Sequence, residues 1–257
     1  MSKPDFPNGA AIVFGGSGGM GTALCNRLAE MGSDVAVCYR SNEGAADRVA
    51  GEVAAHGRKG SVHQVDIADK ESIRRCFANA VETHGRIHTV MCTAGSDIEQ
   101  PLLADVTDEQ WAEVVNADLN GFFHIAQAAI PHMREKGGGS FVHLSSAGIL
   151  RTPPRDVLSV APKMGIEGLV RFIAKEEGEN GIRANSIALG VIEAGIFKRL
   201  QAQGVFDEAW EQAVLGGLAI KRFGQPEEVA DMACFLASDR ALYTTGQLIA
   251  VDGGFGV

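Results

Sequence analysis

Aromatic side chains are scarce in this sequence, and tyrosine is nearly absent. Only 6% of the 257 residues are aromatic, and Tyr39 and Tyr243 are the two tyrosines. Tyr39 ends a predicted strand, and Tyr243 lies in the C-terminal segment. A reaction that needs a phenolic proton donor from the middle of the chain therefore has no tyrosine to use.

Other absences exclude whole classes of protein. A net charge of -9 argues against a protein that binds nucleic acid through its phosphate backbone. No apolar run reaches the roughly 20 residues of a membrane span, and residues 1–9 lack the apolar core of a signal peptide. The five cysteines are widely spread and show no metal-ligand spacing. We therefore expect a cytoplasmic protein with reduced thiols, no metal site and no nucleic-acid or membrane partner.

Short apolar segments alternate with helical segments along the whole chain. The apolar segments are rich in Val, Ile and Ala, which is typical of parallel strands buried on both faces. Strands are predicted at Ala11–Phe14, Asp34–Tyr39, Ser61–Val65, Thr89–Cys92, Ser140–Leu144, Arg183–Ala188 and Leu248–Val251. Helices are predicted at Thr22–Met31, Glu43–His56, Lys70–His84, Asp108–Met133, Leu158–Glu177 and Pro226–Ala237. The alternation predicts an α/β fold: one doubly wound Rossmann domain over residues 1–257, with a seven-stranded, mostly parallel sheet and helices on both faces.

Residues 191–223 are the least regular part of the sequence. They contain one helical stretch, Phe206–Val214, between glycines. They follow a late strand, at the edge of the sheet where doubly wound folds bind ligands. We expect a substrate lid here, with a purely structural excursion as the alternative.

A glycine-rich turn follows the first strand. It reads Gly-Gly-Ser-Gly-Gly-Met-Gly and includes Gly15, Ser17, Gly19, Met20 and Gly21. Its glycines fit both G-x-G-x-x-G and G-x3-G-x-G. Such a turn lets the backbone approach a pyrophosphate, and the following helix offers unpaired N–H groups and positive potential. The turn predicts a dinucleotide site, and a tight turn without a ligand is the alternative.

The end of the second strand bears on which dinucleotide is bound. NAD-specific sites usually place an acidic residue here to bind the ribose 2′-hydroxyl. This chain instead has Arg40 and Ser41, followed by Asn42. A guanidinium can pair with a 2′-phosphate, and the two polar side chains can donate hydrogen bonds to it. NADP(H) is therefore favoured and NAD(H) is the alternative, in which case Arg40 is a solvated surface residue.

The glycine turn, Cys92-Thr93-Ala94-Gly95, Ser145-Ser146, Lys163 and the ending at residues 246–254 together resemble the short-chain dehydrogenase/reductase family. The resemblance covers nearly the whole chain. Residues 222–230 resemble the branch that contains the 3-oxoacyl-carrier-protein reductases. Members of the family are usually tetramers that pair through their long helices. The resemblance therefore implies a homotetramer or homodimer here, formed through Asp108–Met133 and Leu158–Glu177.

The resemblance also assigns positions along the cofactor. Asp66 and Ile67 would flank the adenine, and Ala94 and Gly95 would lie beside the adenosine ribose. Lys163 would bind the nicotinamide ribose. Gly190 and Ile192 would line the nicotinamide carboxamide.

The catalytic positions depart from the family pattern. The family uses Asn, Ser, Tyr and Lys, with the last two spaced Tyr-x3-Lys. Alignment on Lys163 puts Ser159 at the tyrosine position and Ser146 at the serine position, and the asparagine position is Asp118. A serine hydroxyl is shorter and far less acidic than a phenol. The implied catalytic residues Ser146, Ser159, Lys163 and Asp118 therefore lack the family's proton donor.

Three replacements for this donor are open. A water molecule between Ser159 and Lys163 is our preferred candidate; Asp118 and the substrate itself are the others. Asp118 is more simply interpreted as the ion-pair partner of Lys163 or as a carboxylate bonded to backbone. His143 and Cys92 are interpreted as core residues rather than catalytic ones.

The sequence predicts an NADP(H)-dependent oxidoreductase that transfers hydride between the nicotinamide and a small carbonyl/alcohol or enoyl substrate. The enoyl option rests on 2,4-dienoyl-CoA reductases, which share a serine at the tyrosine position. That branch needs another acid, either a tyrosine upstream of the lysine or an aspartate elsewhere, and in this chain Gly148 occupies the corresponding upstream position. The alternative function is a catalytically weak or inactive NADP(H)-binding protein, acting as a sensor or as a silent subunit of an oligomer.

Overall fold

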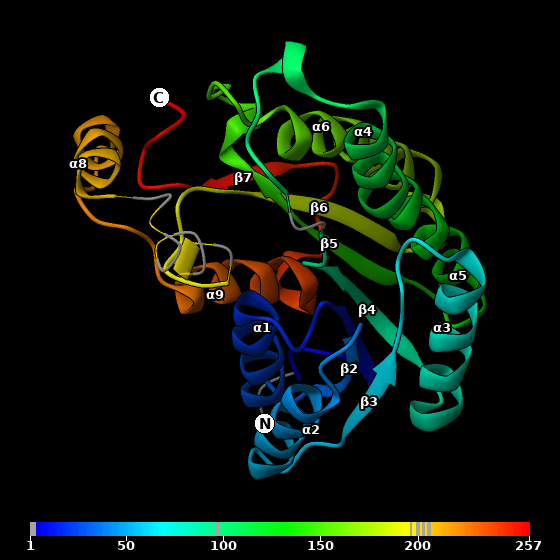
Figure 1. Cartoon of the computed structure of the whole chain (residues 1–257). Coiled ribbons are helices and arrows are strands. Elements are labelled where there is room, and N and C mark those ends of the chain that lie inside the picture. The colour runs from blue at the N-terminus through cyan, green and yellow to red at the C-terminus, as the bar shows by residue number, and fades with distance from the viewer. Residues whose placement is uncertain (1–3, 96–97, 196, 199–200, 202–203, 205–206) are drawn as a thin grey trace.

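One seven-stranded sheet forms the centre of the molecule, with strand order β3-β2-β1-β4-β5-β6-β7 (Figure 1). The computed structural model describes residues 4–95, 98–195, 197–198, 201, 204 and 207–257. The strands are β1 Ala10–Phe14, β2 Asp34–Tyr39, β3 Gly60–Gln64, β4 Ile87–Cys92, β5 Gly139–Ser146, β6 Ile182–Leu189 and β7 Leu248–Val251. All six neighbouring pairs are parallel. The α/β prediction is confirmed, and the sheet is wholly rather than mostly parallel.

Helices cover both faces of the sheet (Figure 1). The described helices are α1 Gly19–Glu30, α2 Glu43–Ala55, α3 Lys70–His84, α4 Asp108–Val114, α5 Gly121–Glu135, α6 Val157–Glu176, α8 Glu208–Gly217 and α9 Pro226–Ala237, and α8 stands to one side of the sheet (Figure 1). Alternate strand residues supply the two cores. Ala11 and Val13 of β1 pack in the core that includes residues of α1, α2 and α9. Ile12 and Phe14 point the other way, into the core that includes residues of α3, α5 and α6.

The predicted helix Asp108–Met133 is wrong as a single element. The structure has α4, then a π-helical segment (η2, Val115–Asn120), then α5. The apolar pattern continues through the break, so it does not reveal a change of helical pitch. Gly121 explains part of the local path, since a Cβ there would lie 2.7 Å from the Ile67 carbonyl oxygen. π-helical turns are frequent at functional sites, and this one carries Asp118.

The predicted lid is only partly described. Residues 196, 199–200, 202–203 and 205–206 lie outside the described residues, and they include the first residue of the helix predicted at Phe206–Val214. The described helix is α8, and Asp207 caps it by accepting a hydrogen bond from the Trp210 N–H. Phe223 packs beside Phe197, with ring centroids 4.9 Å apart. Across the described residues, no helix is long and apolar enough to cross a membrane.

Candidate active site

The glycine turn joins β1 to α1 at the carboxyl edge of the sheet. Gly15 has a φ of +85°, and a Cβ on it would lie 2.8 Å from the backbone nitrogen of Ala94. Both features require glycine. Helix α1 begins after Gly18, and no described side chain caps it. The first turn of α1 carries no acidic residue. The first N–H groups of α1 therefore suit an anionic group, and the turn that includes Ser17, Met20 and Gly21 fits a pyrophosphate.

The adenosine-side residues lie at the ends of the adjacent strands β2 and β3. Arg40 and Ser41 are exposed directly after β2. Asn42 caps α2 by accepting a hydrogen bond from the Ala45 N–H. Asp66 is exposed just beyond β3, and its carboxylate accepts a hydrogen bond from the Ala68 N–H. The fold thus brings an arginine and an exposed acid to one edge of the sheet, with the arginine directly after the end of β2.

The segment after β6 crosses the glycine turn. Gly190 donates a hydrogen bond from its N–H to the Val251 carbonyl, and a Cβ on it would lie 2.7 Å from the Cα of Asp252. Ile192 forms an isolated bridge with Gly224 and lines a hollow of about 310 Å³. A Cβ on Gly19 would lie 3.2 Å from the Cβ of Ala194. The predicted nicotinamide side and the predicted pyrophosphate side therefore adjoin each other.

Ser146 ends β5, and Ser159 and Lys163 lie on the first turns of α6. The Ser146 Oγ accepts a hydrogen bond from the Gly148 N–H at 3.0 Å. Its own O–H therefore stays available to donate to a substrate oxygen. Lys163 Nζ lies 3.5 Å from the Ser159 Oγ and 3.4 Å from the Ser159 carbonyl oxygen. The one-turn spacing of residues 159 and 163 on a helix accounts for this contact.

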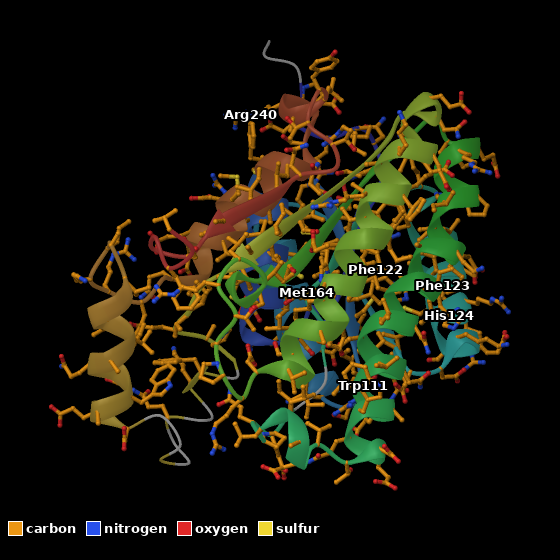
Figure 2. All side chains as sticks on the ribbon, turned by 90° about the horizontal axis from the view of Figure 1, so that it is seen from above. Trp111, Phe122, Phe123, His124, Met164 and Arg240 are labelled. Atoms are coloured by element: carbon orange, nitrogen blue, oxygen red, sulfur yellow. The ribbon has the colours of Figure 1, made fainter. Side chains whose placement is uncertain are left out.

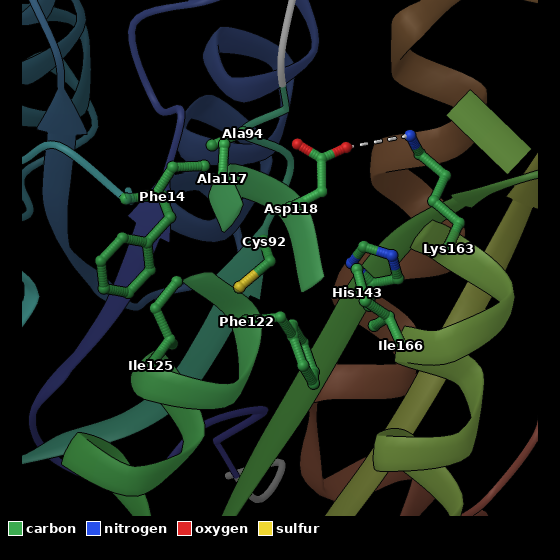
Figure 3. A pocket seen from close by; sticks show the side chains of 11 residues that line it. Phe14, Cys92, Ala94, Ala117, Asp118, Phe122, Ile125, His143, Lys163 and Ile166 are labelled. Atoms are coloured by element: carbon green, nitrogen blue, oxygen red, sulfur yellow. Dashed lines mark ion pairs between the residues drawn. The ribbon is translucent and has the colours of Figure 1, made fainter. Parts of the chain in front are cut away.

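Asp118 and Lys163 form an ion pair (Figure 3). The distance from Lys163 Nζ to Asp118 Oδ2 is 3.6 Å, and the two side chains are 19% and 5% exposed. A Cβ on Gly95 would lie 3.6 Å from the same carboxylate oxygen, so Asp118 sits against the segment after β4. Of the three roles considered for Asp118, namely proton donor, ion-pair partner of Lys163 and carboxylate bonded to backbone, this contact corresponds to the ion-pair partner.

A small cavity lies beneath this pair (Figure 3). Its volume is about 20 Å³, with room for about one water molecule. His143 lines it and is fully buried, and burial, with a contribution from the Lys163 charge, lowers its pKa to about 3. Burial likewise raises the pKa of the Cys92 thiol. Both side chains are uncharged at neutral pH, as their interpretation as core residues predicts.

Asp156 is a candidate that sequence reasoning missed. It is the N-cap residue of α6, three positions before Ser159. Burial raises the pKa of its carboxyl to about 6, and the Lys163 ammonium acts in the opposite direction. The sequence contains one indication of this residue: an acid at i-3 shares a helix face with Ser159 and, one turn later, with Lys163. Its partial burial, which sets the pKa, is visible only in the fold.

Comparisons with known proteins agree on one family. A family model described as Enoyl-(Acyl carrier protein) reductase matches residues 15–256. The 3-oxoacyl-[acyl-carrier-protein] reductase of Staphylococcus aureus is 33% identical over 245 residues, covering 95% of this chain and 97% of that protein. The corresponding reductase of Chlamydia trachomatis is also 33% identical, over 253 residues, covering 96% and 97%.

Solved structures give the same result. A short-chain type dehydrogenase/reductase from Mycobacterium ulcerans superposes with a TM-score of 0.91 at 28% identity, covering 98% of this chain and 91% of that one. Levodione reductase superposes with a TM-score of 0.91 at 27% identity, covering 98% of both chains. The chain belongs to the short-chain dehydrogenase/reductase family, whose members are oxidoreductases that use a nicotinamide dinucleotide.

Proposed function

We propose that this protein is an NADP(H)-dependent reductase of small carbonyl compounds, including 3-oxoacyl thioesters, with enoyl thioesters as a second substrate class. The observation that carries the proposal is the approach of Lys163 Nζ to within 3.5 Å of the Ser159 Oγ. This cluster lies on the sheet edge that also carries the glycine turn. The thioester class is supported by the names of the curated relatives and of the matching family model.

The proposed cofactor site uses the residues that the resemblance assigns. When bound, NADPH supplies the hydride. The turn at residues 15–21 would hold the pyrophosphate, and Lys163 would bind the nicotinamide ribose. Ser146 would donate its hydroxyl proton in a hydrogen bond to the substrate oxygen, which positions the carbonyl for attack. The remaining proposed contacts are those of Asp66, Ile67, Ala94, Gly95, Gly190 and Ile192.

Preference for NADPH is proposed from Arg40 and Ser41. No acidic residue ends β2, and the exposed guanidinium can pair with a 2′-phosphate. NADH remains the second cofactor in this proposal.

A homotetramer or homodimer is proposed from the exposed apolar side chains of α4, α5 and α6. Trp111 and Phe123 are each 43% exposed, Met164 is 44% exposed, and Phe172 is 63% exposed. Figure 2 shows the first three on neighbouring helices. Large apolar side chains gathered in this way are typical of protein–protein contacts.

One observation favours the alternative function. Lys163 is paired with the Asp118 carboxylate, and the side chain that its ammonium approaches on α6 is that of Ser159 rather than a tyrosine. A sensor or silent subunit would bind NADPH and not oxidise it. Fluorescence titration with NADPH, followed by NADPH oxidation with ketones, 3-oxoacyl thioesters and enoyl thioesters, separates the two functions. Binding with oxidation supports a reductase, and binding without oxidation supports the alternative.

A further inference from the structure

We infer that the carboxyl group of Asp156 is the proton donor of the reduction, in place of the tyrosine that this site lacks. The inference rests on the proposed reductase function.

The position of Asp156 fits this role. A residue three before Ser159 at the start of α6 lies on the same helix face, with Cβ atoms about 5–6 Å apart. The first turns of α6 adjoin Ser146, because a Cβ on Gly148 would lie 2.6 Å from Val160 Cγ2 and 3.1 Å from Ser146 Oγ. A serine at 159 has a far shorter side chain than the tyrosine of the family pattern. Asp156 begins the helix whose first turns adjoin Ser146, and we infer that its carboxyl reaches a substrate oxygen held there.

The carboxyl of Asp156 is not used for the usual task of an N-cap aspartate. Within the described helix it makes no capping hydrogen bond, although aspartate is among the preferred capping residues. Burial raises its pKa to about 6. A carboxyl of this kind keeps part of its protonated form near neutral pH, which a general acid needs.

The charged groups near Asp156 include Lys163 and the partner of that ammonium, Asp118. Lys163 is the charged neighbour that lowers the pKa of Asp156, and Asp118, from η2, is ion-paired with the same ammonium. Two arginines close in sequence point elsewhere. Arg155 donates a hydrogen bond to the Gln100 carbonyl, and Arg151 lies over the ring of Phe255.

The step balances without a further reactant. When bound, NADPH would supply a hydride, one hydrogen with two electrons, to the carbonyl carbon. The Oδ–H bond of Asp156 breaks as a new O–H bond forms at the carbonyl oxygen. The products are the alcohol, NADP⁺ and the Asp156 carboxylate, which regains its proton from water.

Four proteins test the inference: the unmodified chain, Asp156→Asn, Asp156→Glu, and Glu82→Gln as a control that removes an exposed carboxylate on α3. We expect Asp156→Asn to lower kcat for acetoacetyl-thioester reduction about 100-fold or more. Its affinity for NADPH should stay within about twofold, because no cofactor contact changes. Asp156→Glu should recover part of kcat, and Glu82→Gln should match the unmodified protein. If Asp156→Asn does not fold, Asp156→Ser, which keeps a good N-cap residue, replaces it.

Two pH measurements accompany the rates. Carboxyl carbon NMR of the protein without cofactor should show a resonance that titrates near pH 6 and vanishes in Asp156→Asn. In the unmodified protein kcat should fall as pH rises through this value, and the variant should lose that dependence. A kcat within about threefold of normal in Asp156→Asn, or the same pH profile, overturns the inference while the reductase function stands. NADPH binding without oxidation by the unmodified protein overturns both.

Discussion

Lys163 Nζ lies 3.6 Å from Asp118 Oδ2, and both side chains are largely withdrawn from solvent. The aspartate comes from a π-helical segment and the lysine from α6, so the pair joins two elements that are about 45 residues apart in sequence. A charged pair at this point both fixes the ammonium and partly neutralises it. In the proposed site the Lys163 ammonium is therefore paired with a carboxylate of the protein itself, that of Asp118.

Loss of this pair should destabilise the fold. Asp118→Asn leaves the Lys163 ammonium mostly buried without its carboxylate, which should lower the free energy of unfolding by about 1–3 kcal/mol. Urea unfolding measures this change. In the double variant Asp118→Asn/Lys163→Met the loss should be smaller than the sum of the two single losses. Additive losses would mean that the two side chains do not interact in solution.

Asp156→Asn should stabilise the fold, in contrast to Asp118→Asn, and it should do so only at higher pH. The folded protein binds the Asp156 proton more tightly than the unfolded chain, since the pKa rises from 3.8 to about 6. The stabilising effect of that proton is complete below pH 3.8 and is lost as pH rises through about 6. At pH 8 the variant should be more stable than the unmodified protein by about 1–2 kcal/mol, a value reduced for partial exposure.

Unfolding by urea at pH 4 and at pH 8 checks this prediction. Near pH 4 the two proteins should differ little. An equal difference at both pH values would show that the carboxyl does not carry a raised pKa.

Arg40 should determine the cofactor preference. Arg40→Asp removes the partner of the 2′-phosphate and adds an acid that can bind a 2′-hydroxyl, so NADH should become the tighter ligand. We expect NADPH affinity to fall about tenfold or more, since a charge-assisted hydrogen bond contributes about 1.5–3 kcal/mol. Fluorescence titration with both nucleotides measures the change, with Arg74→Asp on α3 as the control. Equal affinities in the unmodified protein would remove the basis of this prediction.

Phe172 should contribute to subunit contacts. It is 63% exposed on α6, and Phe172→Glu would place a charge in the proposed interface. Sedimentation should show a dimer or tetramer for the unmodified protein and a smaller species for the variant. Arg74→Glu, on α3, should leave the assembly intact. A monomer at micromolar concentration for the unmodified chain contradicts the proposed oligomer.

Most of the fold could be predicted because short, continuous apolar runs in the sequence indicate buried strands. Short runs such as Val35–Tyr39 are buried on both faces, and that pattern has few solutions other than a parallel sheet under two layers of helices. The π-helical segment at Val115–Asn120 could not be predicted in this way. Its apolar spacing continues that of the flanking helices, and the change of pitch depends on tertiary contacts such as that of Gly121 with Ile67.

The site could be predicted in part. The family resemblance assigned Ser159 and Lys163, which the structure places 3.5 Å apart. The ion pair of Asp118 with Lys163 was one of three open roles for that residue. Asp156 was missed because its raised pKa comes from burial at the start of α6. The spacing to Ser159 and Lys163 could have indicated the residue, but its burial does not follow from residue type or spacing.

A single-turnover reaction decides whether this protein is a reductase. The unmodified chain, in molar excess over NADPH, is mixed with an acetoacetyl thioester, and NADPH absorbance and the hydroxyacyl product are followed together. We predict that the nucleotide is oxidised in step with product formation, one hydride for each alcohol. NADPH that is bound, as shown by its fluorescence, and yet stays reduced with this substrate, with simple ketones and with enoyl thioesters would contradict the proposed function.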